Sequence, residues 1–167
     1  MTQQIITVFG GSGFLGRYVV RALAATGTAI RVACRRQRDA MFCKSMGDVG
    51  QIVPVQCNVR DKKSVGAAIK GADCVINLTG ILFERGTQTF DSVHSEGALC
   101  VAKAARDNGA DRLIHVSAIG ADVESESVYA KSKGTGEILV QDAFPDSVIL
   151  RPSLVFGPED DFFNRFS

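Results

Sequence analysis

Histidine and paired cysteine are scarce in this sequence. Only His94 and His115 occur, and the five cysteines form no CxxC pair. Zinc and related metals need a cluster of such ligands at defined spacings, so no metal site is expected. The cysteines lie mostly in apolar runs such as ADCVINL and ALCVAKAA, where a thiol behaves as a small hydrophobic group. We therefore expect free, buried thiols in a reducing compartment.

An excess of charge of one sign is also missing. The 19 Lys and Arg residues nearly balance the 18 Asp and Glu residues, which leaves a net charge of +1. A nucleic-acid surface needs a basic excess that neutralises phosphates, so no nucleic-acid partner is expected. No apolar run has the length of a membrane span, and MTQQIITVFGG leads directly into a strand, without the pattern of a signal or transit peptide. The expected location is the cytoplasm of a bacterial cell.

What the sequence does contain is a regular alternation of short apolar runs and longer helical patterns. Continuous apolar strands separated by helices predict a parallel sheet with helices on both faces. Right-handed crossovers then give an α/β, doubly wound Rossmann-type domain, which we assign to residues 1–157. The expected strands are 4–9, 30–34, 51–55, 74–79, 112–117 and 147–151, and the expected helices are 14–26, 37–46, 62–70, 90–108 and 127–143.

Residues 158–167 form a separate short segment. Pro158 and the acidic residues 159–161 have the composition of a helix start. Phe162, Phe163 and Phe166 would then have little to pack against. We interpret this segment as the start of a truncated C-terminal portion that would complete a substrate pocket.

A glycine-rich turn joins the first expected strand to the first helix. The spacing of Gly10, Gly13 and Gly16 is GxxGxxG, and Gly11 adds an overlapping GxGxxG. Such a turn brings backbone N–H groups close to a pyrophosphate, and the helix N-terminus adds partial positive charge. The strand–turn–helix context favours a dinucleotide site over an empty glycine turn. Its predicted residues are Gly10, Gly11, Ser12, Gly13, Phe14, Leu15 and Gly16.

The end of the second expected strand indicates which dinucleotide binds. An acidic residue there would contact the adenosine 2′-hydroxyl of NAD(H), but the strand runs into ACRRQRD. Arg35 and Arg36 offer planar guanidinium groups that suit a 2′-phosphate. Asp39 lies too far along the chain to take the acidic role. NADP(H) is therefore favoured over NAD(H), with a solvated turn as the alternative.

Residues that follow the later strands extend the predicted site. Asn58 and Val59 are expected beside adenine, whereas Asp61 is expected to cap the next helix. Thr79 and Gly80 end the fourth strand beside the expected nicotinamide ribose. Pro152, after the sixth strand, is expected on the nicotinamide side. The loop 81–90 is consistent with a lid over the cofactor or with a docking loop for a partner.

Tyr129 and Lys133 are four residues apart in SVYAKSKGTGE, which places both on one face of the expected helix. A lysine beside a phenol can lower its pKa for proton transfer, and Ser117 is placed to bind a carbonyl oxygen. The same lysine and phenol can instead hold the ribose of a permanently bound cofactor, without turnover. His94 and His115 are expected to be structural, as a helix-start residue and a satisfied core histidine.

The segments VFGGSGFLGRYVVRAL, SVYAKSKGTGE and ILRPSLVFGPEDDFFNRF together resemble the short-chain dehydrogenase/reductase superfamily. A closer likeness, in these segments and in VHSEGALCVAKAARDNGADRLIHVSAIGAD, is to one atypical branch, the NADPH-binding accessory subunits of respiratory complex I and their bacterial relatives. The resemblance implies bound NADPH, subunits of NADH:quinone oxidoreductase as partners, peripheral placement on the membrane and a structural or assembly role. It assigns the diphosphate to the glycine turn, the 2′-phosphate to Arg35 and Arg36, and the YxxxK pair to Tyr129 and Lys133.

One feature of the sequence departs from this resemblance, and two other functions are also consistent with the sequence. The interval from Ser117 to Tyr129 is shorter than in most extended members, so Ser117 is the nearest match to the superfamily serine and no more. Two alternatives to the accessory subunit also remain. One is an NADP-dependent reductase or epimerase/dehydratase that uses the Tyr–Lys pair, and the other is a regulator that senses the redox state of NADP.

Overall fold

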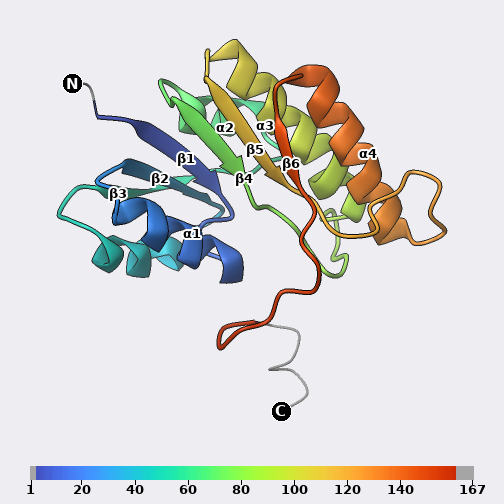
Figure 1. Ribbon diagram of the computed structural model, residues 1–167, viewed down its shortest axis with the longest axis horizontal. Coiled ribbons are helices and arrows are strands. Elements are labelled where there is room, and N and C mark those ends of the chain that lie inside the picture. Colours follow the sequence, from blue (N-terminus) through green and yellow to red (C-terminus); the bar gives the residue numbers. More distant parts are fainter. Residues whose placement is uncertain (1–2, 161–167) are drawn as a thin grey trace.

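The computed structural model describes residues 3–160, and a six-stranded parallel sheet lies at its centre (Figure 1). The strand order is β3-β2-β1-β4-β5-β6, which is the order of a doubly wound Rossmann-type fold. The predicted fold class is therefore confirmed. The strands are β1 (Ile5–Phe9), β2 (Ala29–Cys34), β3 (Ile52–Gln56), β4 (Cys74–Asn77), β5 (Arg112–Val116) and β6 (Val148–Leu150).

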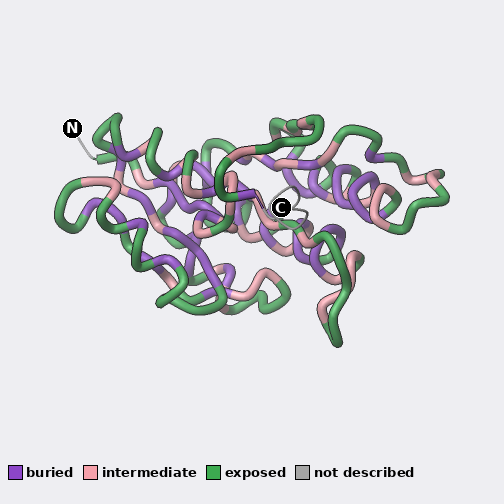
Figure 2. Tube along the Cα trace, turned by 90° about the horizontal axis from the view of Figure 1, so that it is seen from below, coloured by how far each residue is buried: buried purple, intermediate pink, exposed green. Residues whose placement is uncertain are grey.

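Helices cover both faces of the sheet. On one face lie α1 (Phe14–Ala24) and η1 (Gln37–Met46), and on the other lie α2 (Lys62–Ile69), α3 (Glu96–Asp107) and α4 (Val128–Ala143). Alternate residues along the strands enter two separate cores. Figure 2 shows that the buried stretches of the chain lie in its interior, with exposed loops around them. Each fully buried valine or isoleucine in them contributes about 1.5–3 kcal/mol. The first core includes Val65, Val75, Val101 and Leu113, and the second includes Val8, Val20, Val32 and Ile52.

Two helical segments differ in type from a regular α-helix. Residues Gln37–Met46 form a 3₁₀ helix, and its buried residues Ala40 and Cys43 are three apart, as three residues per turn require. The expected helix 90–108 begins with a π-helical turn, η2 (Asp91–Ser95), that contains the buried His94. The hydrogen bonds of that side chain, described below, account for the wider turn.

The topology creates a crevice at the carboxyl end of the sheet. β1 pairs with β2 on one side and with β4 on the other. The strands that follow β2 and β4 therefore extend the sheet in opposite directions from β1. A ligand site is expected outside the carboxyl ends of the strands at such a switch point.

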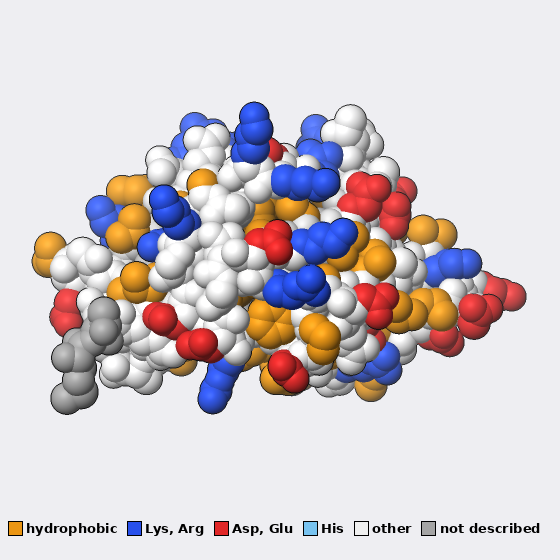
Figure 3. Space-filling model, turned by 90° about the horizontal axis from the view of Figure 1, so that it is seen from above, with side chains coloured by type: hydrophobic (Ala, Val, Ile, Leu, Met, Phe, Trp, Pro, Cys, Tyr) orange, Lys and Arg blue, Asp and Glu red, His pale blue; other side chains and the backbone are white. Residues whose placement is uncertain are grey.

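The face seen from above carries side chains of both signs with hydrophobic ones between them (Figure 3). The described residues end at 160. The expected helix start at 159–161 therefore extends beyond them, and the aromatic residues Phe162, Phe163 and Phe166 lie outside them.

Helix α4 packs unusually close to η2, and glycine makes this possible. A Cβ added to Gly136 would overlap the carbonyl oxygen of His94. We expect Gly136→Ala to lower the free energy of unfolding by about 2 kcal/mol, because the backbones must separate. In Gly66→Ala, the matched control in α2, the Cβ meets nothing within 4 Å, so stability should rise by about 0.5–1 kcal/mol. Urea unfolding measures both changes, and equal stability of Gly136→Ala and the wild type would contradict this packing.

Candidate functional site

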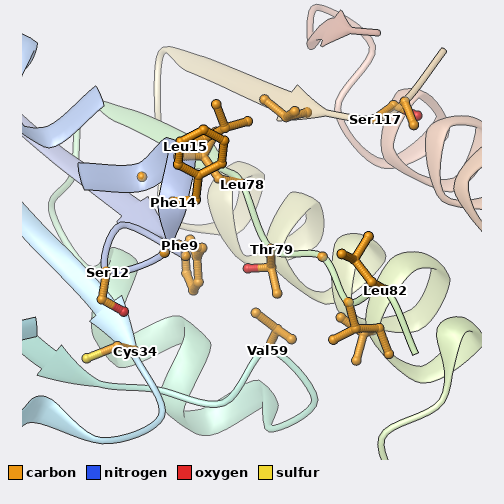
Figure 4. Close-up of a pocket in the computed structure, with 18 of the residues that line it drawn as sticks. Phe9, Ser12, Phe14, Leu15, Cys34, Val59, Leu78, Thr79, Leu82 and Ser117 are labelled. Carbon is orange, nitrogen blue, oxygen red and sulfur yellow. The ribbon is translucent and has the colours of Figure 1, made fainter. Parts of the chain in front are cut away.

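A cavity of about 540 Å³ lies at the carboxyl ends of the strands, within the usual range of small-molecule sites. Figure 4 shows Ser12 and Cys34 at one end, Leu82 at the other, and Thr79 between them. Its lining includes residues from each motif singled out in the sequence. Those residues are Gly10, Ser12, Gly13, Phe14, Leu15, Gly16, Arg35, Asn58, Val59, Thr79, Gly80, Ser117, Tyr129, Lys133 and Pro152.

The glycine turn presents an open backbone to this cavity. Gly10 has φ +75, a left-handed conformation that favours glycine, and a Cβ on Gly16 would overlap the Gly10 carbonyl oxygen. Among residues 3–160, no side chain caps the N-terminus of α1, and its first turn contains no acidic residue. The first N–H groups of this helix therefore keep their partial positive charge toward the cavity.

Two predicted cofactor residues are not among those that line the cavity in the described part of the chain. Gly11 faces the core, where an added Cβ would meet Val8, Val20 and Val32. The Arg36 guanidinium turns to Asp39 instead, with Nε donating to Oδ2 at 2.8 Å. An arginine three residues before an aspartate forms this local ion pair readily on a helical turn.

The other predictions near the adenine end have clear outcomes. Asp61 caps α2 as expected, since its Oδ1 accepts from the backbone N–H of Lys63 at 3.0 Å. Asn58 lines the cavity, and its Oδ1 accepts from the backbone N–H of Arg60 at 3.2 Å. Arg60 and Gln88 also line the cavity, and the sequence reasoning missed both. In the sequence, the position of Arg60 directly after Asn58 and Val59 could have indicated that it lines the same cavity.

Tyr129 and Lys133 project from α4 into the cavity. Lys133 is buried, and its Nζ donates to the carbonyl oxygen of Val116 at 2.9 Å. Burial lowers the pKa of Lys133 to about 8, although the Glu137 carboxylate partly opposes this shift. Burial raises the pKa of Tyr129 above its usual 10.0. The phenol is therefore neutral at physiological pH, and the lysine remains mostly protonated there.

An ion pair fixes the end of β6 against α4 beside these residues. The Arg151 Nε donates to both carboxylate oxygens of the buried Glu137, at 2.9 and 3.1 Å. Burial alone would raise the pKa of Glu137, but the hydrogen bonds and the positive charge of Arg151 lower it below its usual value. The charged pair thereby positions Pro152, the next residue after Arg151, at the cavity wall.

His94 connects the loop after β4 to α4. Its Nε2 accepts from the backbone N–H of Ile81 at 3.0 Å, and its Nδ1 lies 3.0 Å from the Ser132 hydroxyl. Ser132 donates to the carbonyl oxygen of Tyr129, so the proton of the neutral ring is on Nδ1. The ring also packs edge-on against Tyr129, with 5.3 Å between centroids. The expected structural role of His94 at a helix start is confirmed.

His115 is a core histidine with only one satisfied nitrogen. Asn77 accepts from the backbone N–H of Thr79 through Oδ1, so its Nδ2 donates to His115 Nδ1 at 3.1 Å. His115 Nε2 then carries the proton, and it has no hydrogen-bond partner among residues 3–160. The expectation of a fully satisfied ring was therefore wrong for this nitrogen.

Two further findings hold for the described residues. No helix among them is long and apolar enough to cross a membrane. No group of three or more His, Cys, Asp and Glu side chains among them could hold a metal ion.

Comparison with protein families and characterised sequences gives consistent matches. A model of the 3-beta hydroxysteroid dehydrogenase/isomerase family matches residues 7–147. Subunit 9 of the NADH dehydrogenase [ubiquinone] 1 alpha subcomplex, mitochondrial, of Rattus norvegicus is 39% identical over 164 residues, or 98% of this chain and 44% of that protein. Ceramide reductase of Caulobacter vibrioides is 36% identical over 156 residues, or 93% and 48%. The chain thus spans about half the length of these relatives.

Solved structures share the fold at lower sequence identity. A putative NAD-dependent epimerase/dehydratase from Bacillus halodurans superposes with a TM-score of 0.80 at 20% identity, covering 95% of this chain and 74% of that one. A dTDP-glucose 4,6-dehydratase from Streptomyces venezuelae, solved with NAD bound, gives 0.77 at 20% identity, covering 94% and 58%. At this identity the likeness establishes the Rossmann-type fold alone.

Proposed function

The chain belongs to the 3-beta hydroxysteroid dehydrogenase/isomerase family and is a Rossmann NAD(P)-binding protein, and we propose that its ligand is NADP(H), bound mainly to stabilise an accessory subunit of an NADH:quinone oxidoreductase. One observation carries the proposal: the glycine turn, Arg35, Tyr129 and Lys133 line a single cavity. The 39% identity to the rat complex I subunit supports the choice of partner. We further propose a peripheral position on the cytoplasmic face of the membrane.

The chemistry of the cavity fits such a dinucleotide. The uncapped N-terminus of α1 offers backbone donors for the diphosphate, and Arg35 offers a guanidinium for the 2′-phosphate. Gly13 leaves room for close approach, since within residues 3–160 an added Cβ would meet the Gly10 carbonyl oxygen alone, at 3.3 Å. Lys133 uses one donor on Val116 and has others for ribose hydroxyls.

The state of Tyr129 supports cofactor retention over turnover. Burial raises the pKa of its phenol, and no opposing shift comes from Lys133. The hydroxyl is thus a hydrogen-bond donor at neutral pH, which suits a ribose oxygen.

An NADP-dependent ketoreductase is the second candidate, because Ser117, Tyr129 and Lys133 line the same cavity. The ceramide reductase relative favours it as well. Bound NADPH would supply the hydride. The Tyr129 hydroxyl would then give its proton to the carbonyl oxygen, Ser117 would donate a hydrogen bond to that oxygen, and Lys133 would keep positive charge nearby.

Tyr129→Phe separates the two candidates. For a subunit, removal of one hydroxyl should change NADPH affinity by less than about fivefold, because a neutral hydrogen bond contributes about 1 kcal/mol. For a ketoreductase, carbonyl-dependent NADPH oxidation should fall about 100-fold or more with loss of the proton donor. Calorimetry and absorbance at the NADPH band measure the two quantities. Native mass spectrometry of the protein from its own cells identifies its companions, and isolation without complex I subunits would contradict the subunit proposal.

A further inference from the structure

Two arginines at the adenosine end of the cavity have no acidic partner among residues 3–160. Arg35 follows β2 and Arg60 follows β3, and both line the cavity. Within residues 3–160 neither forms an ion pair, although Arg36 and Arg38 both contact Asp39. Each of the two guanidinium groups therefore keeps a full positive charge beside the cavity.

In the described part of the chain, the carboxylates that line the cavity are Asp39 and Asp160, and neither forms an ion pair with Arg35 or Arg60. Asp39 Oδ2 accepts from Arg36 Nε at 2.8 Å, and its Oδ1 lies 3.7 Å from Arg38 Nε. Asp160 Oδ2 accepts from the backbone N–H of Gly157 at 3.0 Å, in the segment after β6. Unpaired guanidinium groups at a cavity wall indicate an anionic ligand.

Both arginines are held by one short loop. Arg60 Nη1 donates to the carbonyl oxygen of Thr87 at 2.5 Å and to its Oγ1 at 3.1 Å, while Arg35 Nη1 donates to Gln88 Oε1. The loop is shaped before any ligand arrives. Arg85 and Gln88 exchange two backbone hydrogen bonds of 3.0 Å, and Glu84 Oε1 accepts from the N–H of Phe90 at 2.7 Å.

The acceptors that this loop offers to Arg35 and Arg60 are all neutral. An amide, a carbonyl and a hydroxyl form weaker bonds with arginine than a phosphate does, because charge-assisted hydrogen bonds are about twice as strong as neutral ones. A phosphate that enters the adenosine end can thus displace Gln88 from Arg35. Arg60 can meanwhile stay attached to Thr87 through one nitrogen and use its other donors.

We propose that Arg60 is the second guanidinium of the adenosine 2′-phosphate site, and that residues 84–90 form a clasp that presents Arg35 and Arg60 to this phosphate. The inference rests on the proposed function, since it requires NADP(H) as the ligand. In this site Arg60, and not Arg36, acts together with Arg35, because the Arg36 guanidinium is paired with Asp39. It also assigns a role to a loop whose sequence was equally consistent with a lid or a docking surface.

Calorimetric titration of the full-length protein with NADPH and NADH tests the proposal. Arg60→Ala should lower NADPH affinity at least about tenfold, the effect of losing a hydrogen bond to a charged group, and NADH affinity less than about threefold. Arg36→Ala, the matched control, should change neither by more than about threefold. Arg60→Lys should restore only part of the loss, because an ammonium keeps the charge without the planar fork.

The outcomes separate this inference from the function on which it rests. A selective loss of NADPH affinity in Arg36→Ala, or equal losses for both dinucleotides in Arg60→Ala, overturns the role of Arg60 and leaves NADP(H) binding intact. A wild-type protein that binds neither dinucleotide overturns both. Circular dichroism of Arg60→Ala confirms its folding, which is expected because the residue is exposed.

Discussion

Gly13→Val is expected to lower NADPH affinity at least about a hundredfold while the protein remains folded, a loss equal to about 2.7 kcal/mol. Gly13 is the residue before α1, and its φ of −79 is open to any amino acid. Among the described residues, the new Cβ would meet the Gly10 carbonyl oxygen alone, at 3.3 Å, so the protein can accept it with a small shift. The branched side chain would then occupy the space through which the diphosphate reaches the helix N-terminus.

Calorimetry with NADPH measures this loss, and the unfolding midpoint in urea reports on the fold. Gly16→Ala is the contrasting variant, because its Cβ would overlap the Gly10 carbonyl oxygen and disturb the turn itself. It should lose both stability and affinity. If Gly13→Val bound NADPH as tightly as the wild type, the diphosphate could not lie on this turn.

Mild acid is expected to destabilise the protein by about 4 kcal/mol between pH 7 and pH 5. The cause is the burial of two neutral histidines. Burial, followed by the charge of Lys133, lowers the pKa of His94 from 6.5 to about 3 and that of His115 to about 4. Below pH 6.5 the unfolded chain binds protons that the folded protein does not, so stability falls as the pH falls toward these values.

The neighbouring charged groups do not reverse this direction. The pKa of Lys133, about 8, lies above the pH window, so the lysine is mostly protonated throughout it. The pKa of Glu137 is lowered below its usual 4.5, so its contribution is lost only in stronger acid. The pH slope between 7 and 5 therefore comes chiefly from the two imidazoles.

Urea unfolding at pH 7, 6 and 5 measures this slope. His94→Asn and His115→Asn should each remove about half of it, whatever stability each variant has at pH 7. The slope is the useful readout, because a purely structural loss would lower stability equally at each pH. A free energy of unfolding that stayed constant from pH 7 to pH 5 would contradict the buried, neutral state of both rings.

The sequence predicted the arrangement of the strands better than the details of the site. Apolar runs such as CVINLT and RLIHVS are typical of buried strands, and the ends of these strands bring Thr79, Gly80 and Ser117 to one crevice through the topology. The glycine turn was predictable for a similar reason, because its spacing between a strand and a helix favours a dinucleotide site over an empty turn.

What the sequence could not predict depends on contacts between distant residues. Arg60 and Thr87 are 27 positions apart, and only the folded loop brings them together. Arg36 looked equivalent to Arg35, but a nearby aspartate competes for its guanidinium. The π-helical turn likewise follows from the hydrogen bonds of His94 with Ile81 and Ser132, which no local pattern reveals.

Titration of the wild-type protein with NADPH and with NADH measures whether this cavity selects the phosphorylated dinucleotide. We expect NADPH to bind at least about tenfold more tightly, the gain from one added charge-assisted interaction. Equal affinities, or tighter binding of NADH, would contradict the account.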